Sequence, residues 1–162
     1  MISNKILELL NKQIRIEGES AQIYLSMHTW AADQGFEGAA KFLMASYHEE
    51  VSHMIKIINY VSDKNERAII TELEAPEKDF GSLKECFDAL LDHELFVAEN
   101  IHALVKACRE SECMPTEMFM HWYVIEQIEE EKIAYAIIDK IKLAGDNKAA
   151  ILEADKYIGC IK

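Results

Sequence analysis

The feature that most constrains this sequence is a glutamate set in the middle of an apolar helical face. After Ser82, hydrophobic residues recur at steps of three and four positions, which is typical of a helix that buries one side. Glu94 interrupts that face at its centre. The apolar positions around it are Leu83, Phe87, Leu90, Val97, Ile101 and Leu104. An ionised carboxylate taken out of water without a partner costs many kcal/mol or takes up a proton. A fold that buries this face therefore has to neutralise Glu94.

Three further segments repeat the pattern, with Glu17, Glu50 and Glu130 near the centres of their apolar faces. His53 lies three residues after Glu50, a spacing that places both side chains on one side of a helix. We call these four glutamates, each in the apolar seam of its helix, the seam acids. Together they carry four negative charges, which two divalent cations would balance. A lone Glu-x-x-His occurs often on a solvated surface, whereas four aligned acids favour a dinuclear metal site.

Composition favours a helical single-domain protein with cations as partners. Half of the residues are hydrophobic, and only two prolines and six glycines are present, fewer turn residues than a sheet protein needs. The 17 basic and 29 acidic residues give a net charge of -12, which argues against nucleic acid or an anionic membrane as a partner. No apolar run is long enough to predict a membrane span.

The cysteines and the start of the chain indicate a location. The four cysteines form no CxxC pair and show no zinc spacing, so they are expected to be free thiols in a reducing compartment. They are Cys86, Cys108, Cys113 and Cys160. The first residues run directly into a charged amphipathic pattern, without the apolar block of a signal peptide. We therefore expect a cytoplasmic protein.

Helical periodicity and end signals predict four long helices and one short one. The expected ranges are about 4–33, 37–64, 82–110, 116–143 and 148–158. The segment 65–81 can reach roughly 56 Å when extended, whereas the second helix is roughly 42 Å long. This segment can cross the whole bundle, which makes the second and third helices parallel. We predict an all-α fold over residues 1–162: a single-domain four-helix bundle with a long crossover and a short C-terminal fifth helix.

Dinuclear carboxylate bundles take one Glu from each of two helices and a Glu-x-x-His from each of the other two. The first and third helices of this chain supply Glu17 and Glu94. The second supplies Glu50 together with His53. Three of the four helices therefore match the pattern.

The fourth helix departs from it, because no histidine stands three residues after Glu126 or Glu130. Gln127 and Glu130 are expected to face inward instead. The first metal would have the ligands Glu17, Glu50 and His53. The second would have Glu50, Glu94, Glu130 and Gln127, with Glu50 bridging the two. Oxygen ligands suit oxidised iron, and the position without an imidazole is expected to bind more weakly and release its metal.

A second group of acids lies beside this set. Glu126, Glu129 and Glu130 share one face of the fourth helix at i, i+3 and i+4. Glu49 precedes Glu50 and is turned about 100° round its helix, where it could join them. Such a group could hold a third iron on its way out of the site.

Three stretches of the sequence resemble the bacterial non-haem ferritins. They are residues 36–43 (FEGAAKFL), 49–53 (EEVSH) and 122–131 (WYVIEQIEEE). The similarity covers essentially the whole chain, including the crossover and the short last helix. It implies a ferritin-like bundle and a cage of twenty-four copies of the chain. In such a cage, Fe²⁺ is oxidised by O₂ and stored in the central cavity as a ferric oxyhydroxide mineral.

The resemblance also implies roles for individual residues. The ferroxidase centre matches Glu17, Glu50, His53, Glu94, Gln127 and Glu130. The family's third iron site matches Glu49, Glu126 and Glu129. Tyr24 matches a tyrosine near the centre that is thought to supply an electron together with a nearby tryptophan, here Trp122. No haem is implied, because Val51 stands where bacterioferritins carry their haem-binding methionine.

Two other classes of function fit the seam acids. A di-iron oxygenase would use the same metals on an organic substrate, and would need an apolar substrate pocket and usually both Glu-x-x-His pairs. A non-catalytic acidic helical scaffold would keep its seam acids protonated or bridged by water. Particle size and the uptake of ferrous iron in air separate the three.

Overall fold

The structure of residues 2–162, a computed structural model, is helical apart from its turns and one long connection. Its helices are α1 (Asn4–Asp33), α2 (Glu37–Asp63), α3 (Leu83–Glu110), α4 (Met114–Ala144) and α5 (Lys148–Ile158). The expected bounds agree with these to within two residues at each end. The largest difference is the start of α4, which includes Pro115 in its first turn, where the missing N–H of a proline costs nothing.

Polar caps and glycines set several of these ends. The Ser82 hydroxyl accepts the backbone N–H of Glu85 at 3.2 Å and so starts α3. Gly35 and Gly145 follow the ends of α1 and α4 with φ of 81° and 55°, a backbone conformation that glycine adopts without strain. The helices therefore stop where the chain can turn sharply.

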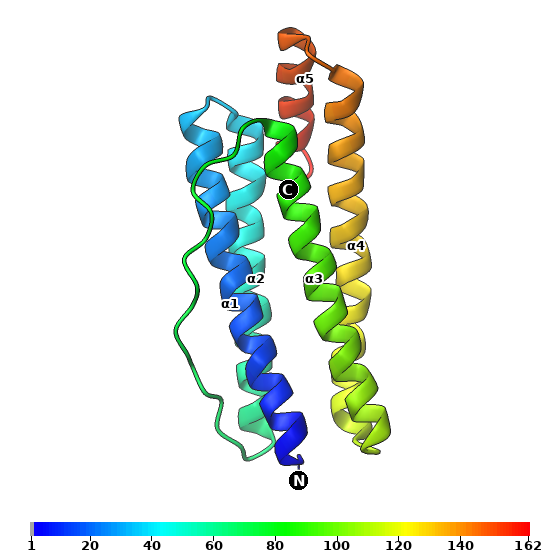
Figure 1. The fold of residues 1–162 in the computed structure, drawn as a ribbon. Coiled ribbons are helices and arrows are strands. Elements are labelled where there is room, and N and C mark those ends of the chain that lie inside the picture. Colours follow the sequence, from blue (N-terminus) through cyan, green and yellow to red (C-terminus); the bar gives the residue numbers. More distant parts are fainter. Residues whose placement is uncertain (1) are drawn as a thin grey trace.

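The four long helices pack as two antiparallel pairs, α1 with α2 and α3 with α4, and α1 also contacts α3 (Figure 1). The crossover, residues 64–82, runs the length of the bundle beside α1. It is attached there by hydrogen bonds that include Ile69 N–H to Asn11 and Ser26 to the carbonyl of Glu77. As a result α2 and α3 run in the same direction, as the reach of the crossover predicts.

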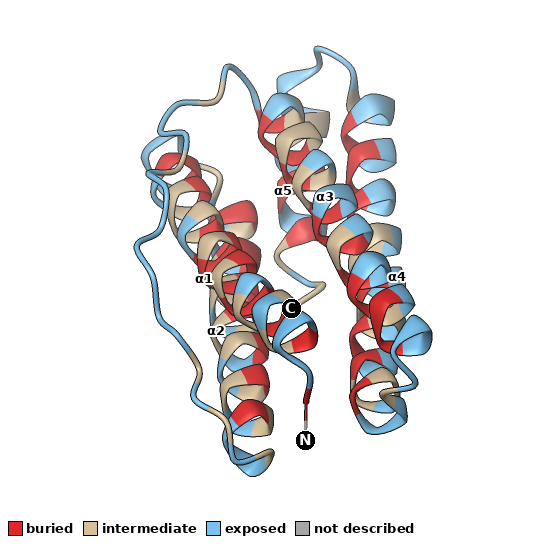
Figure 2. Ribbon diagram, turned by 60° about the horizontal axis from the view of Figure 1, so that its bottom comes forward, coloured by how far each residue is buried: buried red, intermediate tan, exposed pale blue. Residues whose placement is uncertain are grey.

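Hydrophobic side chains fill the bundle in two clusters, and the seam acids lie between them. One cluster is towards α5 and includes Phe42 and Phe87, and the other, towards the opposite end, includes Leu10 and Ile57. Buried residues line the inward faces of the helices, while the crossover is largely exposed (Figure 2). None of the described helices is both long and apolar enough to cross a membrane.

The crossover also explains a glycine inside α1. A Cβ on Gly18 would lie 3.3 Å from Leu73 Cδ2 and 3.3 Å from Met54 Sδ. The missing side chain leaves room for Leu73 of the crossover to pack against α1. Helix periodicity alone gives no reason for this residue.

At the other end, α5 is held by a close backbone approach to the start of α2. The Asp155 carboxylate accepts the N–H of Gly38 at 2.9 Å and that of Ala39 at 2.7 Å, and so caps α2. A Cβ on Gly38 would lie 1.9 Å from the Asp155 carbonyl oxygen, and one on Gly159 would lie 2.7 Å from Gly38 Cα. The two glycines permit this contact, which directs residues 159–162 back along the bundle.

Candidate metal centre

Between the two hydrophobic clusters, three helices each bring one glutamate to the interior. Glu17 of α1, Glu50 of α2 and Glu94 of α3 are only 1%, 5% and 2% exposed. Each stands in the apolar seam of its helix, so the periodicity that buries its neighbours also buries the carboxyl group. Glu130 of α4 is half-buried and acts electrostatically on both Glu50 and Glu94.

The ligands expected for the first metal come together. His53 Nδ1 lies 3.3 Å from Glu50 Oε2 and 3.9 Å from Glu17 Oε2. One ligand atom from each of the three residues lies within 4.8 Å of the others, and among residues 2–162 this is the one such group of acidic, histidine or cysteine side chains. Two carboxylates and one imidazole at this spacing suit a divalent iron ion.

Glu94 is held by two donors at the side of this group. The Tyr24 hydroxyl donates a hydrogen bond to Glu94 Oε1. Gln127 Nε2 donates to Glu94 Oε2 at 2.6 Å and to the Glu94 carbonyl oxygen at 2.9 Å. Gln127 and Tyr24 therefore both contact the acid that the sequence assigns to the second metal.

Burial changes the protonation of these acids. It raises the pKa of Glu17 well above its ordinary value, and the nearby Glu50 carboxylate adds to the rise. Burial likewise raises the pKa of Glu50 well above the usual range, with Glu94 adding to it, and raises the pKa of Glu94 to about 7. Burial therefore favours the protonated form of these acids, and a divalent cation bound among them would offset the cost of burying their charge.

A lysine occupies the outer side of the centre. Lys162, in the segment after α5, has a side chain only 10% exposed. Its ammonium group bonds to the Glu49 carboxylate, to both carboxylate oxygens of Glu130 at 3.3 Å and to Ser46 Oγ at 3.3 Å. Glu49 and Glu130, expected from the sequence as metal ligands, thus converge on one internal cation.

The rest of the expected third site is more open. Glu129 is exposed and pairs with Lys132 on its own helix at 3.3 Å. Glu126 is half-buried, one turn before Glu130 on α4. The structure therefore brings Glu49 to Glu130 through Lys162, while Glu129 faces a surface lysine.

The sequence matches the model of one protein family. The family description "Ferritin-like domain" matches residues 7–144. The chain belongs to the ferritin-like family.

Its relatives are similar over nearly their whole length. A probable bacterial non-heme ferritin-like protein of Haemophilus influenzae is 37% identical over 159 residues, 98% of this chain and 96% of the relative. The bacterial non-heme ferritin of Campylobacter jejuni is 37% identical over 158 residues, 98% and 95% of the two chains. A solved open-pore ferritin from Archaeoglobus fulgidus has a TM-score of 0.98 at 34% identity, and the match covers 100% of both chains. The resemblance and the four-helix fold predicted from the sequence are confirmed.

Three residues of this ferritin-like centre were not singled out from the sequence. Gln13 donates to Glu17 Oε1 at 2.8 Å, and the Tyr123 hydroxyl donates to the carbonyl oxygen of His53 at 2.8 Å. Both stand in the helical seams, where their polar groups were a weak signal of a buried hydrogen bond. Lys162 gave no signal, because its place depends on how α5 docks.

The two aromatic residues that the resemblance pairs adjoin different ligands. Tyr24 contacts Glu94, whereas the Trp122 ring packs edge-on against the His53 ring at 5.3 Å. The Lys56 ammonium lies 3.3 Å from the centroid of the Trp122 ring, a cation–π contact. Their participation in electron transfer stays a prediction.

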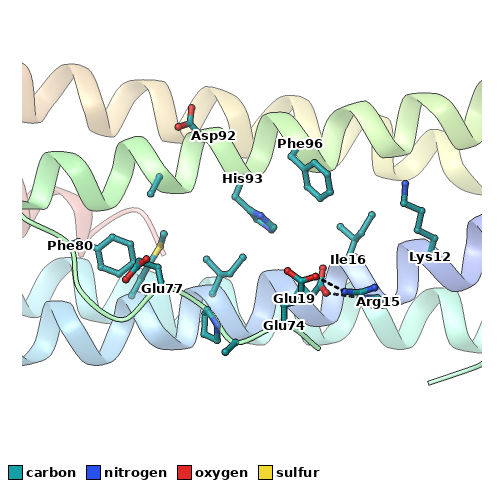
Figure 3. A pocket seen from close by; sticks show the side chains of 15 residues that line it. Lys12, Arg15, Ile16, Glu19, Glu74, Glu77, Phe80, Asp92, His93 and Phe96 are labelled. Atoms are coloured by element: carbon teal, nitrogen blue, oxygen red, sulfur yellow. Dashed lines mark hydrogen bonds and ion pairs between the residues drawn. The ribbon is translucent and has the colours of Figure 1, made fainter. Parts of the chain in front are cut away.

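A pocket of about 630 Å³ lies outside the ferritin-like centre, between α1, α3 and the crossover (Figure 3). None of the candidate ligands lines it. His93 separates it from the centre: its Nε2 is 2.8 Å from Ser20 Oγ and its ring packs edge-on against Tyr24 at 6.1 Å. Burial lowers the pKa of His93 to about 4, so the ring is neutral at neutral pH. The pocket therefore shares no lining residue with the candidate metal centre.

Proposed function

We propose that this protein is an iron-storage ferritin, which oxidises Fe²⁺ with O₂ inside the bundle and stores the product as a ferric oxyhydroxide mineral in a cage of twenty-four copies. The observation that carries the proposal is the buried group of Glu17, Glu50 and His53, whose ligand atoms lie within 4.8 Å of one another. This group belongs to a chain whose relatives are described as non-haem ferritins.

The donor set supports two iron positions of unequal strength. The first has the ligands Glu17, Glu50 and His53. The second has Glu50, Glu94 and Glu130, with Gln127 beside it. Glu50 is shared, and the imidazole serves only the first position. The second position holds iron less tightly, which suits an ion that is substrate and cargo rather than a resident cofactor. No haem takes part.

Proton release accompanies iron binding at this centre. Because burial raises the pKa of Glu17, Glu50 and Glu94, each acid has to give up its proton before it can serve as a ligand. Fe²⁺ supplies the positive charge that replaces those protons. The acids are therefore stable as a group either protonated or loaded with metal.

Oxidation takes one electron from each of two Fe²⁺ ions, and O₂ accepts these two electrons with two protons to give hydrogen peroxide. The Tyr24 hydroxyl contacts Glu94, and we include Tyr24 among the catalytic residues as the donor of a third electron to the oxygen species, which a further Fe²⁺ then returns to the tyrosine. The ferric product leaves past Glu49, Glu126 and Glu129 towards the cavity of the cage, with a third iron held there in transit. We place this activity in the cytoplasm.

The test is to size the metal-depleted protein and then titrate it with Fe²⁺ in air. We expect a particle of several hundred kilodaltons that takes up many irons per chain. Two irons per chain without further growth would indicate the oxygenase class instead. No iron uptake would indicate an acidic scaffold.

A further inference from the structure

Lys162 is an unusual neighbour for a centre that has to bind cations. Its ammonium reaches Glu49 and Glu130 from outside the four-helix bundle, and it lies 5.0 Å from the centroid of the Phe42 ring. An ammonium group has three N–H donors and no acceptor. Here they are directed at Ser46, Glu49 and Glu130, so the group is fully satisfied without a metal.

The outer and inner acids differ in their bonding partners. Lys162 donates directly to the Glu49 carboxylate and to both oxygens of Glu130. Among the described residues, the partners of the inner acids are instead Gln13, which donates to Glu17 Oε1 at 2.8 Å, and His53, whose Nδ1 lies 3.3 Å from Glu50 Oε2. The ammonium therefore stands at the outer acids and not at the inner ones.

A metal ion and this ammonium cannot share the outer acids. Two like charges a few ångströms apart in a poorly hydrated site repel strongly, and Glu130 offers Lys162 both of its oxygens. We propose that Lys162 is a displaceable counter-ion of the outer half of the centre, which a divalent metal has to expel before it binds Glu130 and Glu49. This inference rests on the proposed function and assigns an order to it: the position of Glu17, Glu50 and His53 fills first.

Contacts that do not involve Lys162 hold α5 in place. The helix is held independently by Asp155 at Gly38 and Ala39, and by Lys41, whose ammonium donates to the Gly159 carbonyl at 2.8 Å. Release of Lys162 therefore needs only a change in its side chain and the residues just before it. The lysine sets the affinity of the outer positions and is a positioning residue, not a ligand.

The first test uses Zn²⁺, which does not change oxidation state, so that binding is measured without the oxidation reaction. Calorimetric titration of the full-length, metal-depleted protein compares wild type with Lys162→Gln, Lys162→Arg and Lys156→Gln. Lys156 on α5 is exposed and, within residues 2–162, pairs with Glu153 alone, so Lys156→Gln is a control for the same loss of charge.

We expect Lys162→Gln to leave the affinity for the first Zn²⁺ per chain unchanged. The affinity for the later Zn²⁺ ions should rise about tenfold, because one nearby competing charge is lost. Lys162→Arg should bind as wild type does, because it keeps the cation. Equal curves for Lys162→Gln and Lys156→Gln would overturn the inference. Weaker outer binding in Lys162→Gln would also overturn it, since Lys162 would then be holding Glu130 in place for the metal.

A second test uses the wild-type protein and needs no variant to fold. Acetic anhydride labels accessible amines, and mass spectrometry measures the rate at Lys162 relative to Lys156. Saturating Zn²⁺ is expected to raise the Lys162 rate severalfold, and an unchanged rate at full metal occupancy would contradict the displacement. If wild type bound the first Zn²⁺ and oxidised Fe²⁺ but Lys162 failed both tests, only this inference would fail. Absence of any Zn²⁺ binding would contradict both this inference and the proposed function.

Discussion

The inner and outer halves of the candidate metal centre offset the cost of burying carboxylate groups in different ways. The inner half, Glu17, Glu50 and His53, is almost completely buried. Burial raises the pKa of its two acids, and the neutral donor Gln13 bonds to Glu17. The outer half, Glu49 and Glu130, is partly open and carries a lysine. A carboxyl group can lose a proton without any movement of the chain, whereas the Lys162 side chain has to change its conformation before a metal ion can bind the outer acids. The two halves therefore differ in what a metal ion would have to displace, and not only in the number of ligands they offer.

The largest effect is expected when the ligand that both proposed iron positions share is removed. Glu50→Ala is expected to slow Fe²⁺ oxidation by more than about 100-fold, because even changes to residues behind a ligand cost about 10–100-fold. Stopped-flow absorbance after mixing with Fe²⁺ in air measures the rate. Glu8→Ala, which removes an exposed glutamate of α1, is the matched control. Equal rates in the two variants would refute the assigned centre.

A packing change tests whether α5 holds the outer half in place. Gly38→Ala puts a Cβ 1.9 Å from a backbone oxygen of α5 and is expected to cost about 1–3 kcal/mol of unfolding free energy, the usual cost of overpacking. It should also tighten outer Zn²⁺ binding, since it loosens the docking of the segment that carries Lys162.

Gly81→Ala is the control for that change. Its Cβ would meet Glu85 Oε2 at 2.0 Å, but this is the end of a flexible side chain that can turn away. Denaturant unfolding measures both variants. An equal effect of the two substitutions would show that the α5 contact has no special role.

The pH dependence of stability isolates one buried acid, Glu94. Folding raises the pKa of Glu94 from 4.5 to about 7 through burial, so the folded state binds more protons than the unfolded state between those values. The metal-free protein therefore loses stability as pH rises through this window. From pH 6 to pH 8 the loss from Glu94 alone is about 1 kcal/mol.

Unfolding of metal-free wild type and Glu94→Gln at several pH values measures this effect. The amide imitates the protonated acid, so the variant should show a flatter dependence on pH. Zn²⁺ should restore the stability of wild type at the higher pH, because the metal replaces the lost protons. An identical slope in the two proteins would show that Glu94 does not carry the shifted proton.

The smallest effect on the first oxidation rate is expected from Glu129, the exposed acid beside the outer half of the centre. Glu129→Ala removes an exposed acid that pairs only with Lys132 among the described residues, and exposed pairs contribute about 0–1 kcal/mol. The first oxidation rate should change by less than about twofold, while the iron oxidised per O₂ and the later turnovers should change. A large fall in the first rate would move Glu129 into the oxidation site itself.

Much of the fold and the inner half of the centre could be predicted because both follow from helix periodicity. A residue in the middle of an apolar seam is buried wherever the helix packs, so Glu17, Glu50 and Glu94 were recognisable before their neighbours were known. The crossover was predictable from its reach. Gly18 was not, because its reason is the side chain of Leu73, which arrives from a distant part of the chain.

The helices, their order and the burial of Glu17, Glu50 and Glu94 follow from local spacing and from the cost of exposing apolar faces, so they can be inferred without a structure. The partner of Glu49 and Glu130 depends instead on how distant parts of the chain pack together. Lys162 meets Glu49 and Glu130 because two glycines let α5 approach α2 closely and turn the following residues back along the bundle. Glu49 and Lys162 are 113 positions apart in the sequence. Their contact depends on how α5 docks, and no local sequence pattern encodes that geometry.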